Sequence, residues 1–204
     1  MEKKTTILGV VMAGGQSRRM SQDKATLRHP KDVTFLNFSI NLLRRLGLEV
    51  VVSGAFYANV QPDIQFVPDD ERHKGPLAGL NAVLSRYPNH PLLVIPVDMP
   101  ALTVELLSLL ISKPLKNRSF GRVIAGDANS KNCVVGTFFP FPLFLSSSAQ
   151  DSIKKALQDQ KWALMPVLES LKLEKIPLKA VWAGQMRNVN TPIELQSFYD
   201  TPGL

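Results

Sequence analysis

Short apolar runs of strand length alternate with amphipathic segments of helix length along most of the chain. A strand followed by a helix and a second strand is typical of parallel strands joined by right-handed crossovers. In the first half, strands are predicted over residues 6–12, 48–52, 64–67 and 92–97, and helices over 35–46, 77–87 and 103–112. We therefore expect an α/β fold, a three-layer αβα sandwich in which helices cover both faces of a mostly parallel, Rossmann-like sheet.

The second half of the sequence is less regular but holds elements of the same two kinds. Strands are predicted over residues 122–125, 134–138 and 179–182, and helices over 152–158, 165–171 and from Pro192 onward. No linker-like stretch or internal repeat divides the 204 residues, a length at which one domain buries roughly 70% of its extended surface. We expect residues 1–204 to form a single domain.

Composition excludes several classes of protein. The single cysteine, Cys133, has no partner for a disulfide or a zinc cluster, so we expect a reducing, cytoplasmic compartment. The three histidines stand apart from one another, which argues against a zinc site. No apolar run reaches the length of a membrane span. The net charge of +7 is spread along the chain without an aromatic-interleaved basic motif, which favours small anionic ligands over nucleic acid.

Glycine and basic residues crowd the segment that follows the first predicted strand. Gly14-Gly15 lets the backbone turn and brings its N–H groups close to an anion. Arg18, Arg19 and Lys24 add cationic donors that suit phosphate. The spacing fits neither a Walker A loop nor the dinucleotide fingerprint. A glycine pair alone is a common turn, and paired arginines often lie in solvent, but their combination with a lysine after one strand favours a phosphate site.

Carboxylates follow two further predicted strands. Asp98 comes directly after the fourth strand, where a carboxylate facing a triphosphate suits Mg²⁺, although a role in a turn explains it as well. Asp69 lies just beyond the third strand and is a candidate to accept hydrogen bonds from a base or to assist the metal. Gly75 and Gly79 allow a nucleotide to approach the backbone closely.

Two amides near the last predicted helix complete the set. In an extended segment alternate side chains point the same way, so Asn188 and Asn190 are predicted to reach one ligand or a metal-bound water. The alternative for Asn190 is a structural role as the N-terminal cap of that helix.

Taken in series, these segments resemble the molybdenum cofactor guanylyltransferases. The family's loop, Leu-Ala-Gly-Gly-x-Ser-x-Arg-Met-Gly-x-Asp-Lys, corresponds to residues 12–24, which read Met-Ala-Gly-Gly-Gln-Ser-Arg-Arg-Met-Ser-Gln-Asp-Lys. Gly-Pro-Leu-Ala-Gly at 75–79, Asp-x-Pro at 98–100 and Asn-x-Asn-Thr-Pro at 188–192 follow in the family's order. The chain departs from the family pattern at Ser21, where glycine is usual, at Ser53, where asparagine is frequent, and at Lys131-Asn132-Cys133, where many relatives carry His-Pro or Gln-Pro.

The resemblance implies a nucleotidyltransferase fold and transfer of GMP from GTP to the terminal phosphate of molybdenum-bound molybdopterin, with release of pyrophosphate. It implies Mg²⁺ as the cofactor, bound by Asp98, and contact with proteins of molybdoenzyme maturation. Nucleotide contacts are expected at Met12, Ala13, Gly14, Gly15, Lys24, Ser53, Asp69, Gly79 and Asp98. Lys24 and Arg19 would stabilise the charge that develops on the phosphate oxygens, and Asn188 and Asn190 are expected near the acceptor.

Other functions remain open at this point. A cytidylyltransferase for molybdopterin or a sugar-phosphate nucleotidyltransferase would share the architecture, because a few loop contacts decide which base is bound. A non-catalytic carrier of the cofactor would also keep the fold, although Lys24 and Asp98 favour an enzyme. Neither a membrane nor a nucleic acid is expected as a partner.

Overall fold

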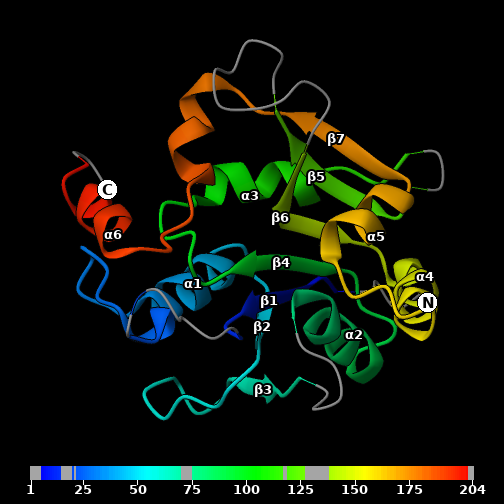
Figure 1. Cartoon of the computed structure of the whole chain (residues 1–204), viewed down its shortest axis with the longest axis horizontal. Helices are drawn as coiled ribbons and strands as arrows, with labels where there is room; N and C mark the ends of the chain where they lie inside the picture. The colour runs from blue at the N-terminus through cyan, green and yellow to red at the C-terminus, as the bar shows by residue number, and fades with distance from the viewer. Residues whose placement is uncertain are drawn as a thin grey trace.

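The computed structural model describes residues 6–14, 20, 22–69, 75–116, 119–126 and 138–201. Its centre is a seven-stranded sheet with the order β3-β2-β1-β4-β6-β5-β7 (Figure 1). The strands are β1 (Leu8–Met12), β2 (Glu49–Ser53), β3 (Gln65–Val67), β4 (Leu92–Pro96), β5 (Gly121–Ala125), β6 (Phe138–Leu145) and β7 (Leu173–Pro177). Within these ranges β6 pairs antiparallel with β4 and β5, and the other pairs are parallel. The predicted α/β fold with a mostly parallel sheet is confirmed.

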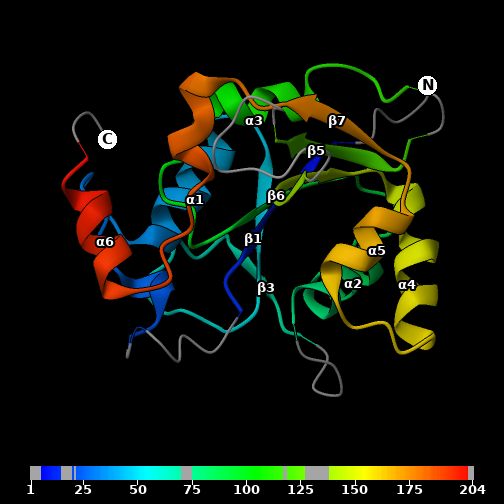
Figure 2. The ribbon, with the colours of Figure 1, turned by 45° about the horizontal axis from the view of Figure 1, so that its top comes forward.

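Two layers of helices cover the sheet (Figure 2). One face packs against α1 (Phe35–Arg44), α3 (Val104–Ile111) and α6 (Pro192–Tyr199), and the other against α2 (Pro76–Arg86), α4 (Gln150–Gln158) and α5 (Leu164–Ser170). Three short 3-10 helices complete the described elements: η1 (Lys24–Thr26), η2 (Ser147–Ala149) and η3 (Ala180–Met186). None of the helices in the described ranges is long and apolar enough to cross a membrane.

The central strands and the helix starts follow from local sequence. Every residue of β1 and β4 is buried, as expected for parallel strands that are covered on both faces. The hydroxyl of Thr34 accepts the Asn37 N–H at 3.1 Å and so caps α1. The chain leaves α1 through Gly47, whose φ of 74° lies in the left-handed region.

The sequence predictions fail mainly in the part of the chain that forms β6, β7 and η3. Residues 179–182 were expected to form a strand, but they belong to the start of η3, where the Trp182 N–H donates to the Lys179 carbonyl at 2.9 Å and closes a turn. Strand β7 and most of β6 were not predicted. The predicted strand over 134–138 is described only at Phe138, where β6 begins, and its other residues lie outside the described ranges.

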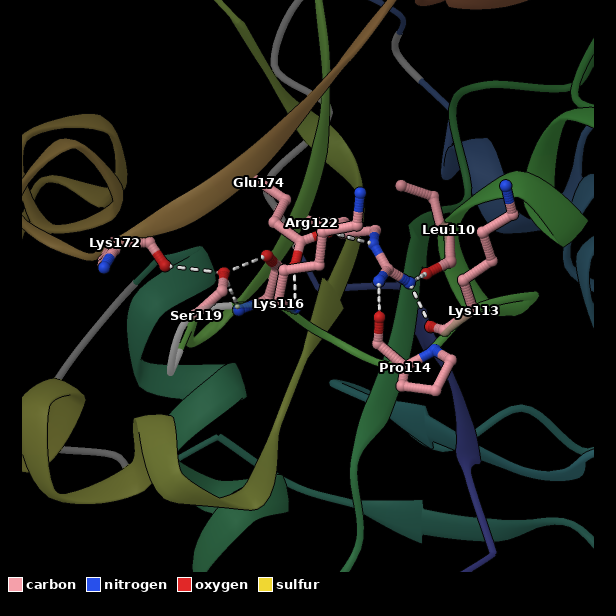
Figure 3. A network of polar contacts seen from close by, with 9 residues as sticks. Leu110, Lys113, Pro114, Lys116, Ser119, Arg122, Lys172 and Glu174 are labelled. Atoms are coloured by element: carbon pink, nitrogen blue, oxygen red, sulfur yellow. Dashed lines mark hydrogen bonds and ion pairs between the residues drawn. The ribbon is translucent and has the colours of Figure 1, made fainter.

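A buried arginine fixes the C-terminal end of α3 to the sheet (Figure 3). Arg122 on β5 is 3% exposed, and its guanidinium donates to the carbonyl oxygens of Leu110 at 2.9 Å, Lys113 at 2.6 Å and Pro114. Its Nε donates to the Glu174 carboxylate on β7 at 2.7 Å. The carbonyls at and beyond the end of α3 are thereby satisfied, and α3 cannot shift without breaking this network.

Candidate active site

The carboxyl ends of β1, β2 and β4 lie level at one edge of the sheet. Met12 pairs with Ser53 on one side and with Pro96 on the other. The Ala13 N–H donates to the Ser53 carbonyl at 2.9 Å, and the Val97 N–H donates to the Met12 carbonyl at 3.1 Å. The loops after β1 and β4 therefore begin at the crevice where open parallel sheets bind ligands.

A cavity of about 370 Å³ lies at this edge. It is lined by Met12, Ala13, Gly14, Asp23, Lys24, Asp69, Gly75, Pro76, Pro96, Val97, Asp98, Phe141 and Asn188. The predicted site residues among them are Met12, Ala13, Gly14, Lys24, Asp69, Asp98 and Asn188. The structure thus brings together side chains from four separate sequence motifs. Gly15 and Arg19 lie outside the described residues, as do Ser21 and residues 131–133.

An ion pair between Lys24 and Asp98 forms the polar centre of the cavity. Lys24 Nζ lies 2.9 Å from Asp98 Oδ2, and the two side chains are 16% and 17% exposed. Lys24 Nζ also donates to Asn190 Oδ1 at 2.5 Å, and Asn188 Nδ2 donates to Asp98 Oδ1 at 3.0 Å. Because the pair is mostly withdrawn from water, a phosphate that enters the cavity meets an ammonium group weakly screened by solvent.

The chain between η3 and α6 carries the two asparagines to this pair. The Val189 N–H donates to the Asp98 carbonyl at 2.8 Å, which places Asn188 and Asn190 on either side of that contact. The N-terminal cap of α6 is Thr191, whose hydroxyl accepts the Glu194 N–H at 3.2 Å. Asn190 is therefore not the helix cap. Its N–H donates to the Glu194 carboxylate at 2.7 Å, and this bond is the main cause that lowers the pKa of Glu194.

Asp69 also lines the cavity and lies in a narrow slot beside Gly14, Gly79 and Ser53. Ser53 is fully buried, and its hydroxyl donates to Asp69 Oδ1 at 3.3 Å. A Cβ built on Gly14 would lie 3.1 Å from Asp69 Oδ2, and one built on Gly79 would lie 2.9 Å from Asp69 Oδ1. Glycine at both positions therefore makes room for this carboxylate. Burial raises the pKa of Asp69, and the Ser53 hydrogen bond opposes that shift. Ser53 and Gly79 do not line the cavity themselves but support the residue that does.

Sequence reasoning missed Tyr57, which contacts Asp23 directly before Lys24 and the backbone at the end of β1. Tyr57 Oη lies 2.7 Å from Asp23 Oδ2 and 3.2 Å from the Ala13 carbonyl oxygen. Burial is the main cause that raises the pKa of Tyr57, and Asp23 adds to it. Asp23 Oδ1 also accepts the Ala25 N–H at 3.0 Å and caps η1, the 3-10 helix that begins at Lys24. Asp23 stood within the family-like motif, but nothing in sequence marked Tyr57.

A second and larger cavity, of about 710 Å³, lies between η3, the 187–190 segment and α6. It shares Asn188 with the first cavity but contains neither Lys24 nor Asp98. Exposed apolar side chains such as Val181 and Ile193 contribute to its walls. Because the phosphate-binding candidates gather in the smaller cavity, it is the candidate active site.

The donors in the smaller cavity suit a nucleoside triphosphate with a divalent cation. Within the described ranges, no group of three or more His, Cys, Asp and Glu side chains forms a metal cage. Mg²⁺ typically needs only one or two carboxylates, because phosphate oxygens and waters supply the remaining ligands. Among the described residues, Lys24 is the hydrogen-bond partner of Asp98 Oδ2 and Asn188 that of Oδ1, and a carboxylate oxygen can accept more than one bond. A single carboxylate beside a lysine therefore fits a cation that arrives with its nucleotide.

Comparison with known proteins identifies the family. Residues 9–175 match the family described as the MobA-like NTP transferase domain. A protein of Rhodopirellula baltica described as a probable molybdenum cofactor guanylyltransferase is 31% identical over 205 residues, which cover 96% of this chain and 92% of that protein. The molybdenum cofactor guanylyltransferase of Xanthomonas euvesicatoria pv. vesicatoria is 32% identical over 196 residues, which cover 90% of this chain and 89% of that protein.

Solved structures agree on the fold. The crystal structure of molybdopterin-guanine dinucleotide biosynthesis protein A from Archaeoglobus fulgidus superposes with a TM-score of 0.72 at 18% identity, over 94% of this chain and 96% of that one. The match of the family domain and the two relatives above 30% identity extend over most of the chain. The chain therefore belongs to the molybdenum cofactor guanylyltransferase family, within the MobA-like NTP transferases, and is a nucleotidyltransferase.

Proposed function

We propose that the protein transfers GMP from GTP to the terminal phosphate of molybdenum-bound molybdopterin, which yields the guanine dinucleotide cofactor and pyrophosphate. The names of the two relatives support the guanylyl donor and the molybdenum cofactor as acceptor. The observation that carries the proposal is the Lys24–Asp98 pair, 2.9 Å apart in the cavity at the carboxyl edge of the sheet.

Direct displacement is the mechanism that this cavity supports. An oxygen of the acceptor phosphate attacks the α-phosphorus of GTP in line, a new P–O bond forms, and the bond to pyrophosphate breaks. None of the described lining residues is a Ser, Thr, Cys or His, so the described wall offers no covalent nucleophile of those types. Catalysis then rests on positioning and on charge.

Lys24 is proposed to stabilise the negative charge that develops on the phosphoryl and leaving oxygens. Its ammonium donates to Asp98 and Asn190 in the free protein, and phosphate oxygens would compete for its hydrogens once GTP enters. The Asn190 contact holds Nζ in the cavity before the substrate arrives. Arg19, which lies outside the described residues, remains the proposed second cation.

Asp98 is the proposed ligand of Mg²⁺. The cation, when bound, neutralises charge on the triphosphate and on departing pyrophosphate. Asn188 keeps the Asp98 carboxylate oriented through its 3.0 Å hydrogen bond, and the Asp98 carbonyl is fixed by the Val189 N–H. The aspartate is thus held by its side chain and by its backbone.

Asp69 is the proposed contact to the guanine nucleotide. A carboxylate accepts hydrogen bonds, and guanine presents N–H donors on its Watson–Crick edge, so the pair is chemically matched. Ser53 stands where the family frequently has asparagine, and its short hydroxyl reaches Asp69. We therefore assign Ser53 to orienting Asp69. Met12, Ala13, Gly14 and Gly15 are proposed to line the path of the phosphates, and Gly79 to leave room for Asp69.

Asn188 and Asn190 are proposed to lie near the acceptor phosphate, because they flank the Lys24–Asp98 pair. We place the protein in the cytoplasm as a single domain over residues 1–204, with molybdoenzyme-maturation proteins as recipients of the product.

The test is pyrophosphate release with Mg²⁺ and molybdenum-loaded molybdopterin, measured in parallel with GTP, CTP and UTP. We expect release with GTP and at least tenfold less with the pyrimidine nucleotides. Faster release with CTP would identify a cytidylyltransferase instead. Release with a sugar phosphate as acceptor would identify a sugar-phosphate nucleotidyltransferase, and nucleotide binding without any turnover would identify a carrier.

A further inference from the structure

His29 is a buried histidine that takes no part in the proposed chemistry. It lies in the segment that follows Lys24 and contacts both the loop after Asp98 and helix α6. His29 lies between η1 and α1, five residues after Lys24, and is 3% exposed. Its segment is closed by a bond from the His29 N–H to the Val33 carbonyl at 2.7 Å. No step of the proposed transfer uses this ring.

Both nitrogens of the His29 ring have fixed partners. Nδ1 accepts the Lys31 N–H at 3.1 Å and must therefore carry a lone pair. The proton then lies on Nε2, which donates to the carbonyl oxygen of Pro100 at 3.0 Å. Pro100 is two residues beyond Asp98, in the loop that joins β4 to α3. The histidine thus connects the lysine segment to the aspartate loop by a hydrogen bond.

Three phenylalanine rings also pack against the imidazole of His29. Phe38 of α1 stacks on the imidazole with ring centres 3.9 Å apart and planes 9° apart. Phe198 of α6 meets it edge-on at 5.5 Å, and Phe35 does so at 6.1 Å. Close by, Tyr199 Oη donates to the Arg28 carbonyl at 2.7 Å. Helix α6, which begins just after Asn190, is therefore held against the same histidine.

The three segments that meet at His29 are those that carry Lys24, Asp98 and Asn190. We propose that His29 is a positioning residue, which holds these segments together and so sets the close contact of Lys24 Nζ with Asp98 Oδ2. The inference rests on the proposed transfer for its effect on rate. The ring itself touches no substrate and acts through Pro100 and the aromatic cluster.

A histidine that merely fills the core would behave differently in a kinetic experiment. Its loss would lower the fraction of folded protein but would leave kcat per folded molecule unchanged. Loss of a positioning residue lowers kcat in protein that is fully folded, because a shift of about 1 Å in a charged group costs up to about 100-fold in rate.

Glutamine and asparagine at position 29 separate these two roles, because their amides overlap different nitrogens of the histidine ring. In His29→Gln the amide nitrogen reaches the position of Nε2 and can donate to the Pro100 carbonyl. In His29→Asn the amide is one methylene shorter, ends near Nδ1 and leaves that carbonyl without its donor. His29→Phe keeps the aromatic packing and removes both hydrogen bonds. Leu168→Ala, at a buried position of α5 on the opposite face, is the control for lost stability alone.

The experiment measures kcat for pyrophosphate release at a temperature where circular dichroism shows each variant folded. We expect His29→Asn and His29→Phe to lose about 10- to 100-fold in kcat, while His29→Gln recovers most of it and Leu168→Ala matches the wild type. Equal kcat for the Gln and Asn variants, or losses no larger than in Leu168→Ala, would overturn the proposal. If His29→Phe fails to fold, the Gln and Asn pair still decides.

Crystal structures of the wild type and His29→Asn provide a readout that is independent of activity. We expect the Lys24–Asp98 pair to open beyond ion-pair distance, about 4 Å, in the variant. An unchanged pair would refute the positioning role even if the enzyme transfers GMP. If the wild type shows no transfer but the pair opens, the proposed function fails and the positioning role stands.

Discussion

Replacing Gly79 with alanine tests whether the slot around Asp69 is as tight as the structure indicates. A Cβ at this position would lie 2.6 Å from Ser53 Oγ, 2.8 Å from Met12 Cε and 2.9 Å from Asp69 Oδ1. The Met12 methyl is the flexible end of a side chain, whereas Ser53 is fully buried. Asp69 faces the cavity, so its carboxylate is the group that moves toward open space and away from its bond with Ser53.

Two opposing effects set the size of the stability change. Overpacking a core position costs about 1–3 kcal/mol. Gly79 lies within α2, where alanine is about 1 kcal/mol more favourable than glycine. The net loss in unfolding free energy is therefore about 0–2 kcal/mol, small enough for the variant to fold. Displacement of Asp69 should weaken GTP binding by about tenfold, which corresponds to about 1.4 kcal/mol.

Calorimetric titration with GTP and urea unfolding measure the two quantities. Gly184→Ala is the matched control, because a Cβ at Gly184 meets no atom of the described residues within 4 Å, and both quantities should stay at wild-type values. Adding Ser53→Ala to Gly79→Ala removes the closest clash, so the double variant should unfold at higher urea than additivity predicts. Wild-type GTP affinity in Gly79→Ala would refute the assignment of Asp69 to the nucleotide.

The Lys24–Asp98 pair, the Arg122–Glu174 pair and the pH dependence of stability can each be tested by substitution. Lys24→Ala and Asp98→Ala should each lose about 3 kcal/mol of transition-state stabilisation, roughly 100-fold in pyrophosphate release, with an unchanged circular dichroism spectrum; full activity in either would contradict the mechanism. Arg122→Met should lower the free energy of unfolding by about 3–5 kcal/mol, because three carbonyls and Glu174 lose their donor, while kcat of the folded enzyme persists. Burial is the main cause that lowers the pKa of His29, so below about pH 6.5 the unfolded chain binds a proton that the folded one refuses. Stability should then fall with decreasing pH by up to about 1.4 kcal/mol per unit, and His29→Phe should remove that part of the slope in urea unfolding; identical slopes would count against it.

The sequence predicts the first half of the fold, from β1 to α3, well because the local sequence patterns there agree with the topology of the sheet. Strands β1 and β4 are apolar and fully buried, β2 is buried except at Glu49, and Thr34 and Thr103 cap the helices that follow β1 and β4. The candidate site was predictable for a related reason. Lys24 and Asp98 follow strands whose ends lie level in a parallel sheet, so their approach needs no knowledge of side-chain packing.

In the other half, β5 and the helices α4, α5 and α6 lie where the sequence predicts them, but β6 and β7 could not be predicted because tertiary context decides them. Strand β6 contains two prolines that argue against a strand, and both fall where its pairing with β5 shifts register between Phe138 and Leu143. Strand β7 lies at the sheet edge and alternates weakly, with charged Glu174 and Lys175 in its middle, as edge strands do. Neither pattern is recognisable before the partner strand is known.

Some site residues carry no local signal at all. Tyr57 is 44 residues from Ala13 and reaches it only through the folding of the loop after β2. His29 carries no local signal either, since its partners Pro100 and Phe198 are distant in sequence. Contacts of this kind depend on how loops pack over the sheet, which periodicity does not report.

In the proposed mechanism, Lys24 and Asp98 act on one triphosphate. The most direct measurement is a crystal structure of the protein with GTP and Mn²⁺ in place of Mg²⁺, located by the anomalous signal of manganese. We predict a manganese ion on the Asp98 carboxylate and phosphate oxygens within hydrogen-bonding distance of Lys24 Nζ. A triphosphate bound instead in the larger cavity beside α6, with Lys24 and Asp98 still paired only to each other, would contradict the account.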